Sequence, residues 1–164
     1  MFHRYWPTFI DLIRIPFEKP ELIWGIVPLY FGWLLNELTS SKASFRTAVQ
    51  TGFSFIWAGT NWAYHYSHRT KVDFLMKGVL PVNVAVTILI LLAGLVALVS
   101  GLRRRYPPGC SFLGHSRFGN YFMILIFPMQ SNYLKWNWNQ LGAIFVFAIP
   151  VWLLLHFGLK PFRK

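Results

Sequence analysis

The chain has 164 residues, of which 55% are hydrophobic and 13% charged, and its mean hydropathy is +0.42. Soluble domains carry about 25% charged residues, so this composition disfavours a soluble protein and predicts one with much of its surface in a membrane. Lys and Arg number 16 against 5 for Asp and Glu, giving a net charge of +11. With so few acidic residues within the chain, the excess of basic residues predicts an anionic partner.

The first 21 residues differ from the rest because charged residues interrupt their apolar positions. Phe9, Ile10, Ile13 and Phe17 have the spacing of one helical face. A helix with one apolar and one polar face lies in the plane of the lipid headgroups. We therefore predict an interfacial amphipathic helix over 1–21, followed by a membrane-embedded helical bundle over 22–164.

Five hydrophobic segments within that bundle each predict a membrane-spanning helix. The clearest is 79–102, which has no ionisable side chain and as a helix would be about 36 Å long, more than the roughly 30 Å hydrocarbon core. The segments do not alternate apolar and polar residues as outer-membrane strands do. The predicted fold is all-α and polytopic, with five crossings preferred and four possible if the fourth segment enters and returns. The five segments are about 22–38, 45–66, 79–102, 118–134 and 141–159.

The basic residues flank these segments. Counts of Lys and Arg on the two sides are nearly equal, so they barely distinguish the orientations. Arg103, Arg104 and Arg105 directly follow the longest segment, and we predict that they bind anionic lipid headgroups on the cytoplasmic side, with the N-terminus outside. No nucleic-acid partner is expected, because such a protein would gather its basic residues on one water-soluble face.

Small residues recur every four positions in the longest segment, at Ala93, Ala97 and Gly101. Such a stripe lets a second helix approach closely, although small residues also recur by chance in so apolar a run. The stripe is a candidate packing face.

Polar residues gather in the first two segments, and two interpretations are open. In one, Glu37 at the end of the first segment pairs with Arg46 at the start of the second, at the membrane edge, where charge is tolerated. In the other, these residues belong to a polar track that faces the bundle interior and lines a path for an ion or small solute. The track would comprise Asn36, Glu37, Arg46, Gln50, Thr51, Ser54 and Asn61.

The sequence indicates no cofactor, metal site or catalytic residues. Cys110 is the only cysteine, so neither an intrachain disulfide nor a thiolate cluster can form. His65 and His156 would lie on opposite sides of the membrane with five crossings, which argues against a shared metal or haem, whereas four crossings would bring them together. Neither a carboxylate pair suited to catalysis nor a phosphate-binding loop is present.

The expected function is therefore that of a non-catalytic, multi-pass membrane protein, an accessory or scaffolding subunit of a larger membrane assembly. Aromatic faces and small-residue stripes offer packing surface, while reactive groups are scarce. Its expected partners are a bilayer with anionic headgroups and other membrane subunits or further copies of itself. The alternative is a small transporter or channel-like protein that uses the polar track.

Overall fold

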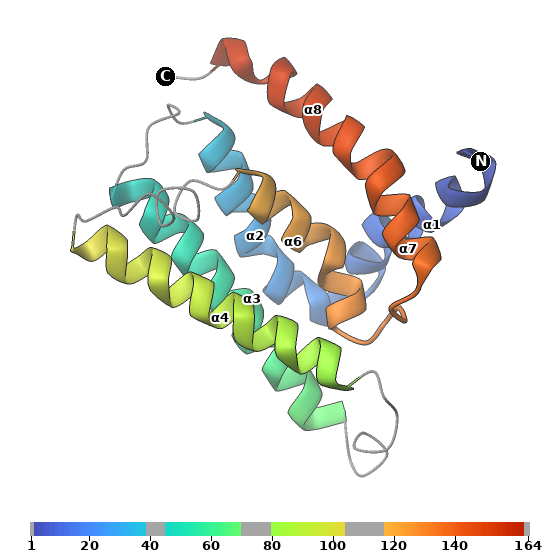
Figure 1. The fold of residues 1–164 in the computed structure, drawn as a ribbon, viewed down its shortest axis with the longest axis horizontal. Helices are drawn as coiled ribbons and strands as arrows, with labels where there is room; N and C mark the ends of the chain where they lie inside the picture. The colour runs from blue at the N-terminus through green and yellow to red at the C-terminus, as the bar shows by residue number, and fades with distance from the viewer. Residues whose placement is uncertain (1, 39–44, 70–79, 104–116, 163–164) are drawn as a thin grey trace.

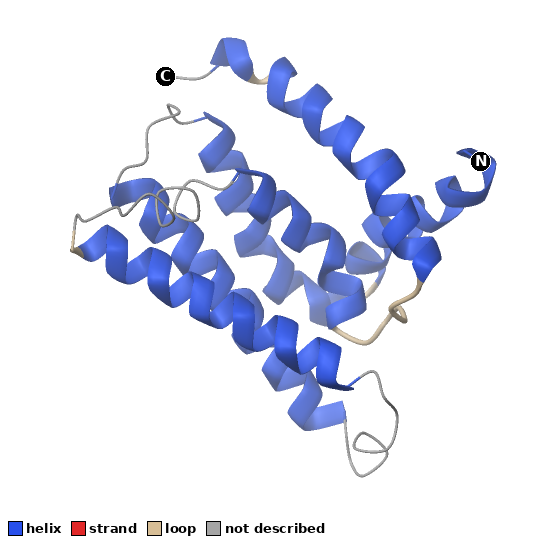
Figure 2. Ribbon diagram, viewed as in Figure 1, coloured by secondary structure: helices blue, strands red, loops and turns tan. Residues whose placement is uncertain are grey.

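The computed structural model describes residues 2–38, 45–69, 80–103 and 117–162, and every regular element in these ranges is a helix (Figures 1 and 2). The predicted all-α fold is thus confirmed. The elements are α1 (Phe2–Glu18), α2 (Pro20–Leu38), α3 (Phe45–Arg69), α4 (Leu80–Leu102), α6 (Arg117–Gln130), α7 (Trp138–Ala143), the π-helical turn η1 (Ile144–Ala148), α8 (Ile149–Gly158) and the 3-10 turn η2 (Lys160–Phe162).

Successive long helices alternate in direction, with α7, η1 and α8 forming one continuous rod (Figure 1). At one end of the bundle, the Tyr66 hydroxyl of α3 donates to the side-chain oxygen of Gln130 in α6. At the other end, Glu37 of α2 meets His156 of α8. We call these the Gln130 end and the Glu37 end.

Two helices in the described ranges are long and apolar enough to cross a membrane, Val82–Leu102 and Trp138–Gly158. The predicted segments 22–38, 45–66 and 118–134 do not meet this criterion, so five crossings are not confirmed. The physical reason is that α2 and α3 carry more polar side chains, while α6 has only 14 residues. These three helices pack in the centre of the bundle.

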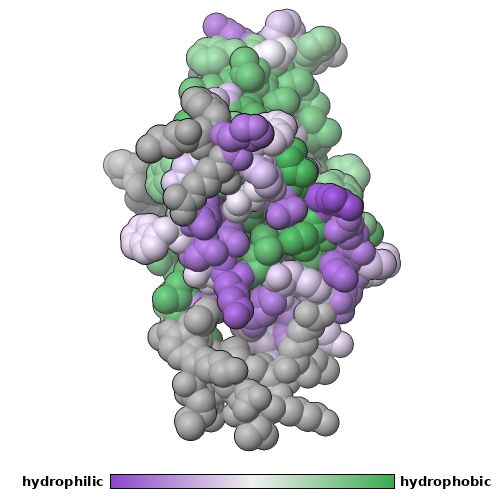
Figure 3. Space-filling model, turned by 90° about the vertical axis from the view of Figure 1, so that its right-hand side faces the viewer, coloured by the Kyte–Doolittle hydropathy of each residue, from purple (hydrophilic) through white to green (hydrophobic). Residues whose placement is uncertain are grey.

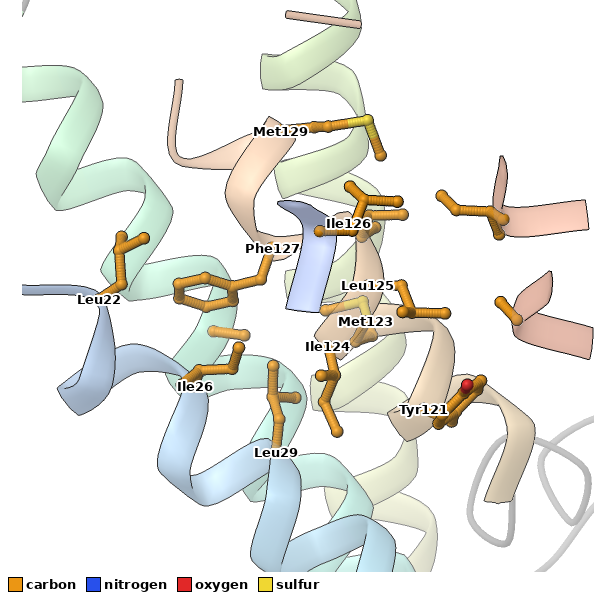
Figure 4. Packing of buried hydrophobic residues seen from close by; sticks show 14 of the residues in the cluster. Leu22, Ile26, Leu29, Tyr121, Met123, Ile124, Leu125, Ile126, Phe127 and Met129 are labelled. Carbon is orange, nitrogen blue, oxygen red and sulfur yellow. The ribbon is translucent and has the colours of Figure 1, made fainter. Parts of the chain in front are cut away.

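The hydrophobic core surrounds α6, whose residues from Met123 to Gln130 are all buried. Figure 4 shows the ring of Phe127 pointing towards α2, where Leu22 and Ile26 lie. Phe127 also packs on Trp62 of α3, with 5.6 Å between ring centroids. The central helix is therefore shielded on several sides by its neighbours.

The end of α6 differs from the predicted segment 118–134 because the helix stops at Gln130. Asn132 has a φ of 59°, the Tyr133 N–H donates to the Pro128 carbonyl and the Asn132 N–H donates to Met129. This is the Schellman arrangement, in which a left-handed residue, often Gly and sometimes Asn, terminates a helix. Polar Ser131 and Asn132 follow the helix, and the predicted segment extended past them to include Tyr133 and Leu134.

The last rod begins with a cap and contains a wide turn. The Asn137 side chain accepts from the Gln140 N–H at 2.9 Å, which fixes the start of α7. The π-helical turn over Ile144–Ala148 comes just before Pro150. Because Pro has no N–H and its ring clashes with the carbonyl four residues earlier, the wider turn accommodates it without ending the rod.

The predicted apolar face of α1 divides into two. Phe9 is buried with Leu12 against the bundle, whereas Ile10, Ile13 and Phe17 are exposed. The exposed residues continue a stripe that includes Trp6, which is also exposed. One turn of the helix therefore offers apolar side chains in two directions, one towards the protein core and one outward.

Glycines bring α3 and α4 close together. A Cβ atom on Gly94 would lie 3.0 Å from the Gly52 carbonyl oxygen, and one on Gly52 would lie 2.8 Å from the Gly94 carbonyl. Of the predicted stripe, Ala97 and Gly101 are buried in this contact and Ala93 is half-buried. This side of α4 is thus a packing face, and Gly94 lies on it next to the stripe.

We expect Gly94→Leu to destabilise the protein by about 1–3 kcal/mol or more, because a larger side chain forces α4 away from α3. Thermal unfolding in detergent measures the effect. Gly158→Leu is the matched control, since a side chain there meets no atom within 4 Å. Equal melting temperatures for the two variants would contradict the tight α3–α4 contact.

Candidate functional site

The most distinctive feature of the interior is a line of mainly polar residues along α3, which we call the polar seam. Its members are three or four positions apart, so they share one helical face. All are buried except Asn61, which is half-buried. The seam consists of Thr47, Thr51, Ser54, Ala58, Asn61 and His65.

Thr51 and Ser54 connect the seam to α2 through hydrogen bonds. The Asn36 side-chain amide donates to the Thr51 hydroxyl at 3.0 Å, and both residues are fully buried. The Ser54 hydroxyl lies 3.2 Å from the Pro28 carbonyl of α2 and 2.9 Å from the Gln50 carbonyl in its own helix. These hydrogen bonds hold α2 and α3 together. They also satisfy hydroxyl and amide groups that would have no partner in apolar surroundings.

A proline in α2 creates a second link to α3. Pro28 has no N–H, so the Trp24 carbonyl, four residues earlier, loses its helical donor. The indole N–H of Trp57 donates to that carbonyl at 2.7 Å. An aromatic residue on the outer surface of α3 thereby replaces the hydrogen bond that the proline removed.

Two glycines of α2, seven residues apart, each face a polar residue of α3. We call each glycine and the residues that it faces a layer. Gly32 faces Ser54, with the Asn120 amide of α6 close by, and Gly25 faces Asn61 and Phe127. A side-chain carbon on either glycine would collide with these neighbours. The absence of a side chain on α2 makes room for the polar groups of α3 and α6.

Asn120 has an unusual position in the first layer. It is fully buried, and neither its amide oxygen nor its amide nitrogen has a hydrogen-bond partner. Buried polar groups nearly always have a partner, protein or water. The side chain therefore adds an unused donor and acceptor to the interior behind Gly32 and Ser54.

Glu37 and His156 form a pair at the Glu37 end. His156 Nδ1 lies 3.2 Å from one Glu37 carboxylate oxygen and 3.4 Å from the other. Glu37 is fully buried, while 22% of the His156 side chain is exposed. None of the residues of α8 is buried. Two specific side-chain contacts connect α8 to the bundle: this pair, and the edge-to-face contact of Trp152 with Phe118.

The structure brings together part of the predicted polar track. Asn36, Thr51, Ser54 and Asn61 lie in the interior between α2, α3 and α6. Arg46 is exposed, and Glu37 points to α8, so the pairing of Glu37 with Arg46 is not the contact that the structure displays. Gln50 is half-buried with its amide oxygen enclosed.

The remaining predicted site residues are divided between the ends of the bundle and the parts not described. Arg103 is exposed at the end of α4, whereas Arg104 and Arg105 lie outside the described residues, as does Cys110. His65 lies near the Gln130 end and His156 at the Glu37 end, as alternating helices require. Within the described residues, no group of three or more His, Cys, Asp and Glu side chains gathers in a way that could hold a metal ion.

No family model, curated protein or solved structure matches this chain. The interior is lined by neutral hydrogen-bonding groups and one carboxylate–imidazole pair. Such groups can hold helices together, and they can also bind an uncharged polar group. Asn120 and the partner of Glu37 were not predicted from the sequence, because Asn120 begins an apolar run and His156 is 119 residues from Glu37.

We expect Glu37→Gln and His156→Ala to be energetically coupled, because each removes the same contact between α2 and α8. A double-mutant cycle of thermal unfolding should give a coupling energy of about 0.5–3 kcal/mol. Each single variant should also speed the hydrogen exchange of α8. Combining Glu37→Gln with His3→Ala, at an exposed position, is the control and should be additive. Additivity in the His156 cycle would show that the contact contributes nothing.

Trp57→Phe should lower the free energy of unfolding by about 0.5–1.5 kcal/mol, because the Trp24 carbonyl loses its donor. In a Pro28→Ala background the restored N–H of residue 28 can bond to that carbonyl, so the same substitution should have a smaller effect. Thermal unfolding of the four proteins measures this difference. Trp138→Phe, at a side chain that is 86% exposed, is the control. An equal effect of Trp57→Phe in both backgrounds would refute the proposed role of Pro28.

Proposed function

We propose that the protein is a multi-pass membrane protein in which α2, α3, α4, α6 and the α7–α8 rod all cross the bilayer, and that it acts without catalysis as an accessory or scaffolding subunit. The observation that carries this proposal is the apolar outer surface of the bundle. Large apolar side chains cover the outer faces of the long helices, while polar residues such as Asn36, Thr51 and Ser54 are buried in the interior beside the hydrophobic core. Water would favour the opposite arrangement, whereas hydrocarbon favours this one.

The outer faces of α2 and α3 support their membrane position despite their modest overall hydrophobicity. Trp24 and Phe31 of α2 are 76% and 61% exposed, and Phe53 and Trp57 of α3 are 54% and 41% exposed. Much of the polarity of α3 belongs to the seam, which faces inward. A hydropathy average over the whole helix combines both faces, so it underestimates how apolar the lipid-facing side is.

Charged and polar residues at the two ends of the bundle support the proposal that these ends lie at the two surfaces of a membrane. The Gln130 end carries Lys19, Glu21 and Lys135 as exposed residues. Figure 3 looks towards this end and shows hydrophilic residues gathered across its middle, with hydrophobic residues above them. At the Glu37 end, exposed Arg103 begins the basic triplet 103–105, which would attract anionic headgroups.

The exposed stripe of α1 supports an interfacial position for that helix. Trp6 and Phe17 are 49% and 63% exposed, with Ile10 and Ile13 between them. Asp11 and Arg14 are also exposed, with Arg14 at the edge of the stripe and Asp11 farther round the helix. A helix at the headgroup boundary would bury the stripe among acyl chains and leave the charges in water.

Two observations favour a scaffold over a transporter, the alternative that uses the polar track. Asn36, Thr51 and Ser54 are hydrogen-bonded to neighbouring side chains or backbone carbonyls, which fastens helices together, and Arg46 is on the outer surface. The exposed aromatic surface and the weakly buried α8 also leave area for partner subunits. Partner subunits or further copies of the chain are therefore the proposed occupants of this surface.

Single cysteines introduced into a Cys110→Ser background test the membrane position. In native membranes, Phe53→Cys on the outer face of α3 should resist a water-soluble maleimide, because it would lie among acyl chains. Lys135→Cys and Arg103→Cys should react, and from opposite sides of the membrane. Labelling of Phe53→Cys as fast as Lys135→Cys would overturn the five-crossing arrangement.

Reconstituted vesicles separate the scaffold from the transporter. A scaffold gives no solute flux, and Glu37→Gln and Asn61→Ala alter only its stability or its co-purification with other subunits. A flux that these two substitutions abolish, while the exposed variant His3→Ala retains it, would favour the transporter. A protein that is strictly monomeric and without partners in gently solubilised native membranes would contradict the scaffold.

A further inference from the structure

The two halves of the last rod are held in different ways. In the first half, Ala143, Ile144 and Ala148 are buried, and the ring of Phe147 stacks on Phe9 of α1 with 5.5 Å between centroids. In the second half, α8, no residue is buried, and the helix packs mainly against η1 and η2 of its own rod. One half therefore belongs to the core, whereas the other lies along the edge of the bundle (Figure 1).

A buried carboxylate holds the far part of α8. His156 Nδ1 lies 3.2 Å from the carboxylate of Glu37, which is fully buried. The Trp152 ring packs edge-to-face on Phe118 of α6 with 5.3 Å between centroids, and η2, which follows α8, touches α2. The first of these contacts joins two groups that can carry charge. The attachment of α8 to the bundle therefore depends on the protonation of this pair.

The two partners change charge in different ranges of pH. Imidazole is the side chain that changes its charge between pH 5 and 8, whereas carboxylates ionise at lower pH. In mildly acidic solution both partners are charged, and charge-assisted hydrogen bonds are about twice as strong as neutral ones. When the imidazole loses its proton, the buried Glu37 carboxylate loses this cationic partner, which is costly for a charge away from water. Protons can reach His156, because 22% of its side chain is exposed.

The other charged groups that the structure describes at the Glu37 end lie on its surface. Arg46 at the start of α3, Arg103 at the end of α4 and Lys160 of η2 are all exposed. Within α8, the ring of His156 lies 5.1 Å from that of Trp152, which is uncharged. Lys and Arg keep their charge between pH 5 and 8. Among the described groups at this end, His156 is therefore the one whose charge changes in this range.

We propose that α8 is a pH-sensitive arm, which the pair of Glu37 and His156 holds against the bundle in mildly acidic solution and releases as the pH rises. The arm turns about η1, where the π-helical turn and Pro150 interrupt the regular helix, while α7 stays packed on α1. This device goes beyond the proposed scaffolding function. It depends on packing and charge, so it can be tested without knowing how many helices cross the membrane.

Distances between nitroxide labels on the full-length protein in detergent test the proposal. In a Cys110→Ser background, one pair of labels joins Phe53→Cys on α3 to Leu154→Cys on α8, both at exposed positions. From about pH 5.5 to about pH 8.5, which bracket the titration of imidazole, these distances should become longer and more broadly distributed. The population with α8 released should rise about tenfold, because a charge-assisted hydrogen bond is replaced by a weaker one. A reference pair, Phe53→Cys with Trp138→Cys on α7, should keep its distance.

Two substitutions test the role of the pair. Glu37→Gln removes the ionised partner, so the distances to α8 should then be the same at both pH values. His156→Lys keeps a positive charge at the higher pH and should hold α8 against the bundle there. The proposal would be overturned by unchanged distances when Glu37 and His156 are both present, by longer distances at the lower pH, or by an equal change in the reference pair. A pH response that survives Glu37→Gln would overturn it as well.

Discussion

The need to satisfy the polar groups of α3 organises the structure. Its seam carries hydroxyl and amide groups into a bundle whose outer faces are apolar. Thr51 and Ser54 have hydrogen-bond partners there, whereas the Asn61 side-chain oxygen has none. The glycines of α2 let the seam approach closely, and the Pro28 carbonyl and the Asn36 amide bond to it. The position of α6 follows as well, because its Asn120 and Phe127 close the two layers that Gly32 and Gly25 begin.

Much of the secondary structure could be predicted from the sequence, because the long apolar segments do not alternate apolar and polar residues as strands do. Within the described residues, the helix Leu80–Leu102 ends at the residue where the predicted segment 79–102 ends. Hydrophobicity predicted the end of α6 less accurately. A local turn at Asn132 ends the helix, although the apolar residues Tyr133 and Leu134 follow. The number of crossings could not be settled by hydropathy either, because inward polar residues and outward aromatic ones are averaged along α3.

The candidate site was predictable only where it depends on local spacing. Thr51, Ser54 and Asn61 share a face by their positions in one helix, so their common orientation could be inferred. The contact of Glu37 with His156 depends on the direction and rotation of two helices far apart in the chain. The sequence instead favoured Arg46 as the partner of Glu37, because Arg46 is only nine residues away.

The wide turn at Ile144–Ala148 sets the rotational phase of the last helix. A π-helical turn contains about one residue more than an α-helical turn, and each residue of an α-helix advances by about 100°. Without that extra residue, α8 would present a side turned by about 100°, and His156 would no longer point to Glu37. For a rod that is apolar nearly all round, this single irregularity decides which flank packs on the bundle and which faces outward.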